Sequence, residues 1–485
     1  MPRHLARDEG PRLAAARHRA RRGRPCGAVA RGRTGRAMSR LAVIGCGYVG
    51  SVSAACLASL GHRVRAVDVD HDRVARLRDA DPPFVETGLP ELVRREIDAG
   101  HLSFGTDVER AVRGADAVLI CVATPTSPSG AADLTQLWGA LDAIAPTVRR
   151  DAVVVLRSTV PVGTGDASAG YLRDVTARRW QGDVVTNPEF LREGTAVHDF
   201  LHPDRLVFGG PAAALDVVER FYAPLRDEHP LVFRMDRRSA ELVKAGANAA
   251  LAAKISLANE VADLCERTGA DARVVLPAIG ADARIGASWL GPGLGWGGSC
   301  LPKDLAALIA TADAAGLGTP LLHAVGAVNE TRIDVAVQKL VAALGSLGGR
   351  RIGVLGVAFK AGTDDLRSSP SLALCARLLD DGATVVASDP LVRRLPEGCG
   401  ALRLAADPYE AAAEADALVV TVPSNVAQDL DPGRLGRAMR GRLVVDLPNT
   451  LETGAFAAAG LDVVGTGWAP GSFAGREVFL TSRGG

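Results

Sequence analysis

The feature that most constrains the fold is a pattern of apolar run, glycine turn and second apolar run that occurs twice in the chain. Near the N-terminus, the run LAVIGCGYVG ends in Gly45-x-Gly47-x-x-Gly50 and leads into a stretch with helical periodicity. The next run, HRVRAVDVD, carries Asp68 near its end. A glycine turn between strand and helix, with an acid about 20 residues further on, is typical of a parallel sheet that binds a dinucleotide.

The same pattern returns late in the chain. The run RRIGVLGVAFK, from Arg350, again predicts strand, glycine turn and helix, and ATVVASDP carries Asp389 where HRVRAVDVD carries Asp68. Further along, EADALVVTVP matches GADAVLICVATP, and RLVVDLPNT matches VVVLRSTVP. Apolar runs that alternate with helical stretches predict a doubly wound parallel sheet. We therefore expect an α/β protein with two Rossmann-like doubly wound domains, although the second lacks a complete GxGxxG. Just after its first turn, Lys360 and the polar run GTDDLRSSP predict an anion-facing loop.

The chain between the two repeats is predicted to be helical. From Ser239 to Thr268 the sequence is rich in alanine, free of proline and helical in period, which predicts one long helix. Lys244 and Asn248 are four residues apart and share a face, where both can donate hydrogen bonds to one oxygen. The alternative is an exposed lysine beside a cap-like asparagine. Small residues along this helix favour packing against a second copy, so we expect a homodimer or a higher homo-oligomer.

A glycine-rich loop, GPGLGWGGSCLPKD, carries the candidate nucleophile, Cys300. Glycines let a backbone take positive φ and approach a bound molecule closely. Pro302 fits the first turn of a helix, so Cys300 is expected at a helix N-terminus, where backbone dipoles lower the pKa of a thiol from about 8.5. Lys303 adds positive charge, and Asp304 lies one helical turn beyond Cys300. The alternative is a structural cysteine in a glycine-rich turn.

These patterns divide the chain into four expected parts. They are a disordered Arg-rich extension (1–37), a dinucleotide-binding domain (38–238), a central helical region with the cysteine loop (239–347) and a second nucleotide-binding domain (348–485). The extension has hardly any acidic residues and no apolar periodicity. Its composition resembles that of a transit peptide, but Met38 closely precedes the first strand, which favours a start assigned too far upstream. A nucleic-acid-binding arm is a third alternative.

Composition limits which binding partners and which cell compartment are expected. The 485 residues carry a net charge of +1, which gives no general attraction to nucleic acid or to an anionic membrane. No apolar run approaches the ~20 residues needed to span a bilayer. The eight cysteines have neither paired nor metal-like spacing, so we expect neither a disulfide framework nor a metal site. A reducing cytoplasm fits this cysteine usage best.

Polar residues at the ends of predicted strands are the candidates for the site of the first domain. The helix after Gly47 presents its N-terminus to a pyrophosphate, and Asp68 would bind a ribose hydroxyl and repel a 2′-phosphate. This predicts NAD rather than NADP, although Arg65 and Arg73 lie nearby in the sequence. At other strand ends, ligand binding competes with a cap or turn role for Thr124, Thr159, Glu189 and Glu193.

Five motifs occur together and in a fixed order over about residues 40–460: GCGYVG, NPEFLREGTA, AELVK with Asn248, GWGGSCLPKD and FKAGTDDLRSSP. In this combination the chain resembles the UDP-glucose/GDP-mannose dehydrogenase family, and NPEFLREGTAVHDFLHPDRLVFG most resembles its UDP-glucose branch. Three features depart from the family pattern. Trp296 stands where Phe or Tyr is usual, Ala245 stands where an aromatic residue is common, and residues 1–37 have no counterpart.

The resemblance implies an N-terminal NAD-binding domain, a central dimer-forming helix and a C-terminal domain for a nucleotide-sugar. It implies NAD-dependent four-electron oxidation of UDP-glucose at C6 to UDP-glucuronate, through a thiohemiacetal and a thioester on Cys300. In this scheme Lys244 and Asn248 stabilise the oxyanion. Asp304 removes the hydroxyl proton through a water.

The resemblance also assigns the remaining site residues. Glu193 with Thr159 would position the hydrolytic water, and Arg284 would reach a substrate bound in a second copy. The residues implied to bind NAD are Gly45, Gly47, Tyr48, Val49, Gly50, Asp68, Arg73, Thr124, Thr159, Glu193 and Lys303. The residues implied to bind the substrate are Glu189, Phe190, Leu191, Arg192, Lys244, Asn248, Arg284, Gly293, Leu294, Gly295, Trp296, Gly297, Cys300, Phe359 and Lys360.

Other functions remain as alternatives. Sister enzymes that act on GDP-mannose or UDP-N-acetylhexosamines share most of these motifs. A two-electron hydroxyacid dehydrogenase can also pair a Rossmann domain with Lys and Asn four residues apart, but it leaves Cys300 and the second α/β domain without a role. A non-catalytic nucleotide-sugar or NAD sensor would keep binding residues and lose Cys300, Lys244 and Asp304, all of which are present.

Overall fold

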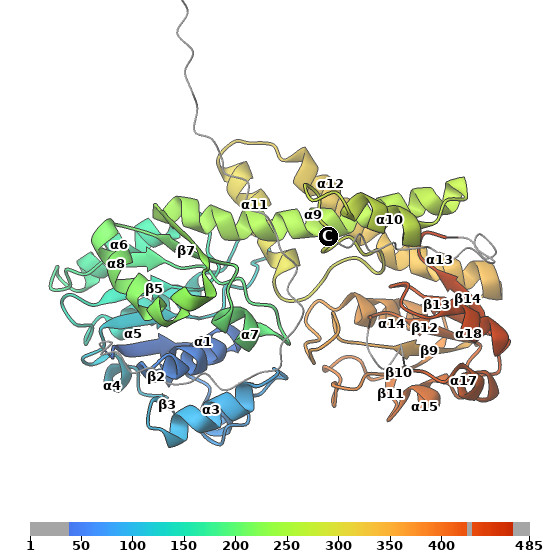
Figure 1. Ribbon diagram of the computed structural model, residues 1–485, viewed down its shortest axis with the longest axis horizontal. Coiled ribbons are helices and arrows are strands. Elements are labelled where there is room, and N and C mark those ends of the chain that lie inside the picture. The colour runs from blue at the N-terminus through green and yellow to red at the C-terminus, as the bar shows by residue number, and fades with distance from the viewer. Residues whose placement is uncertain (1–37, 424–428, 469–485) are drawn as a thin grey trace, which may run out of the picture. The chain divides into compact units, whose positions relative to one another are not determined.

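The fold was analysed in a computed structural model, which describes residues 38–423 and 429–468. The extension at 1–37, predicted to be disordered, lies outside the described residues, as do 424–428 and 469–485. Over the described part, the chain forms two β-sheets and a helical region between them in sequence (Figure 1). The predicted fold class is confirmed.

The first sheet has eight strands in the order β3-β2-β1-β4-β5-β6-β7-β8. Neighbouring strands pair in parallel except β6 and β7, which are antiparallel. The strands are β1 (Arg40–Ile44), β2 (Arg63–Val67), β3 (Leu102–Gly105), β4 (Ala117–Ile120), β5 (Val153–Leu156), β6 (Val184–Thr186), β7 (Arg205–Gly209) and β8 (Leu231–Met235).

The second sheet has six strands in the order β11-β10-β9-β12-β13-β14, all parallel. This order repeats that of the first six strands of the first sheet, as the duplicated sequence pattern predicts. The strands are β9 (Arg351–Leu355), β10 (Thr384–Ser388), β11 (Arg403–Leu404), β12 (Ala417–Val420), β13 (Leu443–Asp446) and β14 (Asp462–Gly465).

Helices cover both faces of the first sheet, which explains why its strands are apolar without alternation (Figure 1). Leu41 and Val43 of β1 pack in one core with residues of α1, α3 and α8, whereas Ala42 and Ile44 pack in another with residues of α4, α5 and α6. The helices of this half are α1 (Tyr48–Ser59), α2 (His71–Arg78), α3 (Leu89–Asp98), α4 (Val108–Val112), α5 (Thr135–Ile144), α6 (Thr164–Val175), α7 (Ala196–Leu201), α8 (Ala212–Phe221) and η1 (Ala223–Glu228).

The predicted long helix is present as α9 (Arg237–Thr268). It starts where the side chain of Asp236 accepts a hydrogen bond from Ser239 N, and it ends at Gly269, whose φ of +76° suits glycine. Further helices follow it along the chain and then in the C-terminal half. They are α10 (Ala272–Gly280), α11 (Leu301–Ala314), α12 (Pro320–Glu330), α13 (Arg332–Leu344), α14 (Pro370–Asp380), α15 (Pro408–Ala412), α17 (Pro432–Ala438) and α18 (Thr453–Ala458).

The prediction of a helix directly after the second glycine turn is wrong. Residues 357–369 form a loop, and α14 starts only at Pro370. Polar side chains bind the loop backbone: Thr363 Oγ1 accepts from Asp365 N over 3.2 Å, and Asp365 Oδ1 accepts from Arg367 N over 2.9 Å. Such local bonds compete with helical ones, so the stretch GTDDLRSSP stays a loop.

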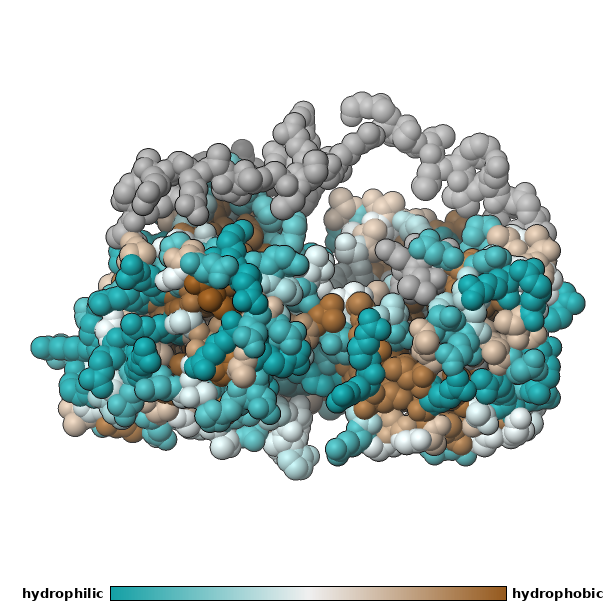
Figure 2. Space-filling view, turned by 90° about the horizontal axis from the view of Figure 1, so that it is seen from below, coloured by the Kyte–Doolittle hydropathy of each residue, from teal (hydrophilic) through white to brown (hydrophobic). Residues whose placement is uncertain are grey.

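In the part of the chain that the structure describes, no helix is both long enough and apolar enough to cross a bilayer. Hydrophilic side chains cover most of the face shown in Figure 2, and hydrophobic ones gather in separate groups among them.

Candidate active site

The first turn of the N-terminal half brings a helix N-terminus against a strand end. Gly45 has a φ of +92°, and its N–H donates to Val67 O over 2.8 Å. A Cβ at Gly50 would stand 1.8 Å from the carbonyl oxygen of Gly45, so only glycine permits this approach. At Gly47, the N-cap of α1, a Cβ would meet nothing within 4 Å. The turn thus leaves open space in front of the α1 N-terminus, which fits the pyrophosphate of a dinucleotide.

Asp68 lies just after β2, at the position predicted for an acid that binds a ribose. Its Oδ2 accepts from Cys46 N over 2.6 Å, and its Oδ1 accepts from Asp70 N over 3.0 Å. Arg73 Nη1 lies 3.1 Å from Asp68 Oδ1. The carboxylate therefore holds the turn in place, and because Arg73 is already ion-paired with it, the site favours NAD over NADP.

Cys300 is the N-cap residue of α11, and Asp304 N donates to its carbonyl oxygen over 2.9 Å. Part of the residue is solvent-accessible, but the thiol itself is largely surrounded by protein, and its Sγ lies 3.6 Å from Ser299 Oγ. Burial of the thiol by surrounding protein raises its pKa; nearby Lys244 opposes this rise and the carboxylate of Glu189 adds to it. The expected lowering of this pKa is therefore wrong, because desolvation outweighs the effect of the Lys244 ammonium.

Lys244 and Glu189 form a buried ion pair beside Cys300. Lys244 Nζ lies 3.1 Å from Glu189 Oε1, and both side chains are almost fully shielded from solvent. Burial acts to lower the pKa of Lys244, but the carboxylate of Glu189 and the neighbouring Cys300 and Asp304 raise it above its ordinary value. The lysine is therefore an ammonium at neutral pH, available to stabilise negative charge near Cys300.

Asn248 and Lys303 both bind Asp304. Asn248 Nδ2 donates to Asp304 Oδ2 over 2.5 Å, and Lys303 Nζ donates to the other oxygen. Asp304 is 2% exposed. Lys244 and Asn248 thus face two different carboxylates, Glu189 and Asp304, rather than one shared oxygen. The structure nevertheless brings both donors and both acids to the neighbourhood of Cys300.

A small cleft, with a cavity volume of about 20 Å³, lies between the end of β5 and the helices α9 and α11. Thr159, Ala245, Lys303 and Asp304 are among its lining residues. Thr124 Oγ1 donates to Thr159 O over 2.8 Å and so fixes the loop that forms one wall. The cleft joins the N-terminal half, which carries the dinucleotide turn, to the helix that starts at the candidate nucleophile.

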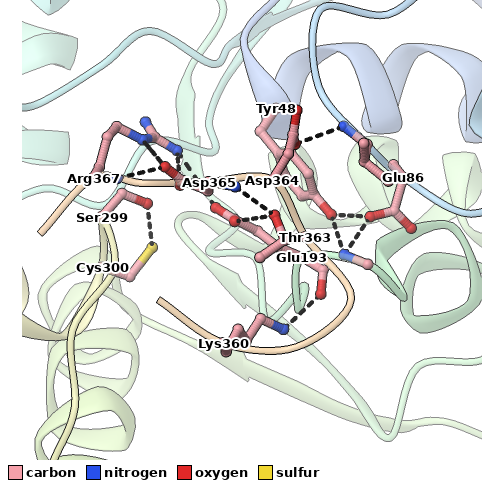
Figure 3. A network of polar contacts seen from close by, with 12 residues as sticks. Tyr48, Glu86, Glu193, Ser299, Cys300, Lys360, Thr363, Asp364, Asp365 and Arg367 are labelled. Carbon is pink, nitrogen blue, oxygen red and sulfur yellow. Dashed lines mark hydrogen bonds and ion pairs between the residues drawn. The ribbon is translucent and has the colours of Figure 1, made fainter. Parts of the chain in front are cut away.

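Glu193 lies against the loop 357–369 of the C-terminal half rather than against Thr159. Figure 3 shows Glu193 within a polar network, with Lys360 Nζ donating to its carbonyl oxygen over 2.6 Å. Thr363 Oγ1 donates to Glu193 Oε2 over 3.2 Å, and Arg367 Nη2 lies 3.5 Å from Oε1. The loop of one half is therefore bound directly to the other half at this residue.

The acidic groups of this network have different pKa values. Burial, reinforced by the neighbouring Asp365, raises the pKa of Glu193 to about 7. Burial also acts against ionisation of Asp365, but its hydrogen bonds with Arg367 lower its pKa below the ordinary value. Below about pH 7, Glu193 is the protonated member and Asp365 the ionised one. Burial lowers the pKa of Lys360, whose ammonium lies close to Arg192.

Comparison with known families identifies all three segments of the chain. Residues 39–226 match the NAD-binding domain of the UDP-glucose/GDP-mannose dehydrogenase family. Residues 238–331 match its central domain, and residues 353–453 match its UDP-binding domain. The chain belongs to the UDP-glucose/GDP-mannose dehydrogenase family. As a member of this family it is an NAD-binding nucleotide-sugar dehydrogenase, and the predicted cofactor is confirmed.

Individual relatives cover nearly the whole chain. It is 44% identical to the UDP-glucose 6-dehydrogenase of Rhizobium meliloti over 84% of its own length and 95% of the relative's. It is 40% identical to the UDP-glucose 6-dehydrogenase of Pseudomonas aeruginosa over 88% of its length and 97% of the relative's. The solved UDP-glucose dehydrogenase of Pyrobaculum islandicum is 37% identical, with a TM-score of 0.80 over 90% of this chain and 99% of that one.

The glycine-rich loop that carries Cys300 packs against protein on several sides. Gly293 N donates to Asn259 Oδ1 of α9 over 3.0 Å. A Cβ at Gly295 would stand 2.1 Å from Asn329 Oδ1, and one at Gly297 would stand 2.3 Å from Ser368 O. These glycines are therefore needed because the loop backbone lies close to other parts of the protein. The sequence pattern alone had predicted that the backbone would lie close to a bound molecule.

Neighbours of these glycines anchor the loop. Trp296 Nε1 donates to Ser256 Oγ over 3.1 Å, and Leu294 is buried in the core of the C-terminal half. A Cβ at Gly298 would touch the ring of Phe359 at 2.6 Å, which places Phe359 beneath the loop. Trp296, the departure from the usual Phe or Tyr, thus gains a hydrogen bond through its ring nitrogen.

Two further residues of the predicted substrate set, Phe190 and Leu191, border the Lys244–Glu189 pair, since Lys244 Nζ lies 5.5 Å from the centroid of the Phe190 ring. Two others, Arg192 and Arg284, lie in other surroundings. Phe190 stacks under Arg205, with 3.8 Å from Cζ to the ring centroid, and Leu191 N donates to Glu189 Oε2 over 2.6 Å. The guanidinium of Arg192 is ion-paired with Asp199 at 2.6 Å. Outside the cleft, the side chain of Arg284 is 89% exposed and is bound to neighbouring Asp282. In a single chain, Arg284 does not reach the site.

Glu86 was missed by sequence reasoning. Tyr48 Oη donates to Glu86, and Gly194 N donates both to Tyr48 Oη over 2.9 Å and to Glu86 Oε2 over 2.7 Å. Burial, together with the hydrogen bond to Glu86, raises the pKa of Tyr48. Val49 beside it packs on the core of the first sheet. Glu86 carries no motif, and only its position in space links it to the site.

Asp365 and Arg367 were also missed as individual site residues. Their stretch, GTDDLRSSP, was predicted to be an anion-facing loop, and Arg367 indeed lies beside the carboxylate of Glu193. Across the described residues there is no group of three or more His, Cys, Asp or Glu side chains arranged to hold a metal ion.

Proposed function

We propose that the protein oxidises UDP-glucose at C6 to UDP-glucuronate in a four-electron reaction with two NAD. The observation that carries this proposal is the solvent-accessible Cys300 beside the buried Lys244–Glu189 pair and Asp304. Relatives named UDP-glucose 6-dehydrogenase, up to 44% identical over most of the chain, support UDP-glucose as the sugar nucleotide. A hydroxyacid dehydrogenase would need no nucleophilic thiol.

The first turn of the N-terminal half is the proposed NAD site. Gly45, Gly47 and Gly50 give the pyrophosphate access to the α1 N-terminus, and Asp68 is placed for the ribose. NAD, when bound there, would accept a hydride from C6 in each oxidation. The remaining assigned contacts, which include Thr124 and Lys303, line or support the adjoining cleft.

The chain's own residues supply the acid–base and covalent chemistry. Asp304, through a water, would accept the proton of the C6 hydroxyl during the first oxidation. The Cys300 thiol would then add to the aldehyde carbon, with its proton passing to the former carbonyl oxygen. Loss of a hydride from that carbon and of the hydroxyl proton would turn the thiohemiacetal into a thioester. Lys244 and Asn248 would donate hydrogen bonds to the developing oxyanion, a contribution of about 3–4 kcal/mol for a well-placed donor.

Hydrolysis of the thioester would regenerate the thiol. Water attacks the carbonyl carbon, the carbon–sulfur bond breaks, and the carboxylate product leaves. Glu193, with a pKa of about 7, is suited to accept a proton from that water near neutral pH, and Thr159 would help to position it. Because Glu193 contacts the loop 357–369, we expect its role to depend on the contact between the two halves.

The second half and a second copy would complete the substrate site. Lys360 and Phe359 lie next to the glycine-rich loop and are proposed to hold the nucleotide-sugar. Leu242, Leu257 and Leu264 of α9 are exposed, and their spacing is close to whole helical turns, so they share one side of the helix. This exposed apolar stripe supports a homodimer, in which Arg284 would reach the substrate of the other copy.

A panel of sugar nucleotides tests the proposed substrate. Purified protein is incubated with NAD and either UDP-glucose, GDP-mannose or a UDP-N-acetylhexosamine, and absorbance of the reduced nicotinamide is followed. UDP-glucose is expected to be oxidised with the highest kcat/KM. A higher kcat/KM for one of the other sugars would reassign the substrate. The solved UDP-D-ManNAc dehydrogenase of Pyrococcus horikoshii, 27% identical, has a TM-score of 0.79, so the fold alone does not decide this point.

Substitution of Cys300 tests the covalent step. Cys300→Ala and Cys300→Ser are expected to abolish net conversion to the acid, because no thioester forms. Cys399→Ala is a matched control, since Cys399 is a half-buried free thiol elsewhere in the C-terminal half. A fully active Cys300→Ala enzyme would contradict the covalent mechanism.

Lys244→Ala should reduce turnover about 100-fold or more while NAD affinity is retained.

A further inference from the structure

A second cleft, independent of the proposed function, opens at the amino ends of β1, β2 and β3. Its cavity volume is about 210 Å³. The turn at Gly45 and the carboxylate of Asp68 lie at the carboxyl ends of the same strands, so this cleft is at the other end of the sheet. Its charged and polar lining residues are Arg40, Arg63, Arg65, Arg113, His101 and Ser103. None of these residues belongs to the candidate active site.

Strand register places three of the arginines on one face of the sheet. Arg40 is the direct partner of Arg63 in the β1–β2 ladder, and Arg65 is two residues further along β2. Partners in register lie about 4.8 Å apart and point to the same side, and alternate residues of a strand share a face. Val64, between the two arginines of β2, is buried on the opposite face. The three guanidinium groups therefore rise from adjacent positions.

The face of the sheet that carries these arginines is covered by α4 only beyond them along the strands. It stays open at the arginines because α4 is only five residues long. Arg63 and Arg65 are exposed, and the guanidinium of Arg65 donates to the carbonyl oxygen of Arg110, at the end of α4, over 2.9 Å. Arg113 follows α4 at the rim and has only a loose, exposed contact with Glu109, at 3.7 Å. A row of cations is thus left at the floor and rim of a concave surface.

Nearby carboxylates are already bound to other groups. Asp116 accepts from the backbone N–H of Arg40 over 2.8 Å and is ion-paired with Arg149 at 2.7 Å. Glu96 is paired with Arg95 at 2.8 Å and with His101 at 3.0 Å. Among residues 38–423 and 429–468, no carboxylate lies within 4.0 Å of the guanidinium groups of Arg40, Arg63 or Arg65.

Three uncompensated guanidinium groups at adjacent strand positions repel one another, and like charges placed opposite each other destabilise a sheet. The planar guanidinium matches the oxygens of a phosphate in a bidentate geometry. A single phosphate cannot neutralise a row of this length, whereas linked phosphates can. We propose that this cleft binds an anion that carries two or more linked phosphate groups, either inorganic or as part of a nucleotide.

Direct binding measurements with paired variants test this site. Inorganic tripolyphosphate is titrated calorimetrically into the full chain at constant ionic strength, with saturating NAD and UDP to occupy the turn at Gly47 and the proposed nucleotide-sugar site. The wild type is compared with Arg63→Gln/Arg65→Gln and with the control Arg393→Gln/Arg394→Gln. The control pair is adjacent and exposed, forms no ion pair within the described part of the chain, and lies in the C-terminal half.

We expect the Arg63→Gln/Arg65→Gln protein to bind tripolyphosphate about tenfold or more weakly, because charge-assisted hydrogen bonds are lost, and the control to bind like the wild type. Without ligand, its thermal midpoint should equal or exceed that of the wild type, since repulsion is relieved. Its NAD-dependent activity should be unchanged. Equal binding by all three proteins, or equal weakening in both variants, would overturn the proposal, because the anion would then only screen surface charge.

A second titration, with ATP, shows whether the site recognises the phosphates alone or a whole nucleotide. ATP and tripolyphosphate of similar affinity would mean that the phosphate chain alone is recognised, and tighter binding of ATP would mean that the base adds contacts. Either result supports the proposed site only if the Arg63→Gln/Arg65→Gln protein also loses the binding. Binding of ATP that survives this double substitution would place the nucleotide elsewhere and contradict the proposal.

Discussion

The two halves of the molecule repeat the same strand order and the same first turn. In the N-terminal half, Gly45 has a φ of +92° and donates to Val67 O over 2.8 Å. In the C-terminal half, Gly356 has a φ of +94° and donates to Ser388 O over 2.8 Å. The agreement of conformation and partner shows that the duplicated sequence pattern forms one scaffold twice.

An acid after the second strand holds this turn in both halves. Asp68 Oδ2 accepts from Cys46 N over 2.6 Å. Asp389 Oδ2 accepts from Val357 N over 2.9 Å and from Ala358 N over 3.2 Å. An acid at this position is therefore not in itself a sign of a dinucleotide site, because it also has a purely structural use.

The halves differ in the segment that comes directly after the turn. In the first, α1 begins at Tyr48, and its N-terminus faces open space at Gly47. In the second, residues 357–369 form a loop whose Lys360 and Arg367 contact Glu193 in the other half. The same scaffold thus presents a bare helix end for a pyrophosphate in one case and a loop that joins the two halves in the other.

The largest effect is expected from Gly50→Ala. The added Cβ would stand 1.8 Å from the carbonyl oxygen of Gly45, so the turn must shift, at a cost of about 3 kcal/mol or more in the free energy of unfolding. NAD binding should be lost with it. At the matching position of the other half, Ala361→Gly should change stability by less than about 1 kcal/mol. Denaturant unfolding and NAD titration measure both, and a Gly50→Ala protein of normal stability would break the comparison.

Replacing each acid with alanine should distinguish its contribution to stability from its contribution to NAD binding. Asp68→Ala and Asp389→Ala both leave backbone N–H groups without an acceptor, which should cost about 1–3 kcal/mol in each case. Only Asp68→Ala should also weaken NAD binding and admit NADP, because Arg73 is then released from its ion pair. Thermal unfolding and the NAD/NADP preference are the measurements. Equal loss of NAD affinity in both variants would show that the halves are not divided in this way.

Gly47→Ala should affect the ligand and spare the fold. Its Cβ would meet no protein atom within 4 Å, so stability should stay within about 1 kcal/mol of the wild type. The methyl group would enter the space assigned to the pyrophosphate and weaken NAD binding about tenfold or more. Ala358 is the counterpart in the C-terminal half, and Ala358→Gly should leave NAD affinity unchanged. Unaltered NAD affinity in Gly47→Ala would move the coenzyme away from this turn.

The smallest effect concerns pH and the contact between the halves. The folded pKa of Glu193, about 7, lies above its ordinary value of 4.5, so the folded state binds the extra proton and the stability from this group falls as pH rises through that window. Above about pH 7, Glu193 ionises beside Asp365. Hydrogen exchange of residues 357–369, corrected for its intrinsic pH dependence, should therefore accelerate a few-fold between about pH 4.5 and pH 7 and level off at higher pH, reflecting about 1 kcal/mol of lost contact.

Glu193→Gln provides the control for this pH effect. Glutamine keeps the shape and cannot ionise, so exchange of the loop should become independent of pH across the same range. The loop's exchange is a structural readout, which separates this effect from any role of Glu193 in catalysis. A pH dependence that persists in Glu193→Gln would assign the effect to another group.

Much of the scaffold could be predicted from sequence because its signals are local. Apolar runs, the glycine turn around Gly45 and the proline-free stretch of α9 each determine their own structure, and the repeat predicted the second sheet. Within residues 357–369, the stretch GTDDLRSSP was predicted as a loop. The helix expected directly after the glycine turn is absent, because side-chain bonds such as those of Asp365 compete with helical ones.

Sequence patterns predicted which side chains would gather near Cys300, but not how they pair with one another. Cys300, Lys244 and Asp304 are brought together as expected. The partnership of Lys244 with Glu189 depends on tertiary contact between α9 and the segment after β6, and no spacing rule encodes it. The sign of the shift in the Cys300 pKa was missed for the same reason, because desolvation depends on everything that surrounds the thiol.

The number of NADH formed per UDP-glucose consumed tests the central claim most directly. Limiting UDP-glucose is converted to completion with excess NAD, and reduced nicotinamide is counted against sugar. A covalently held aldehyde that is oxidised twice on Cys300 predicts a ratio of two, with UDP-glucuronate as the product. A ratio of one, with free aldehyde as the product, would contradict the account.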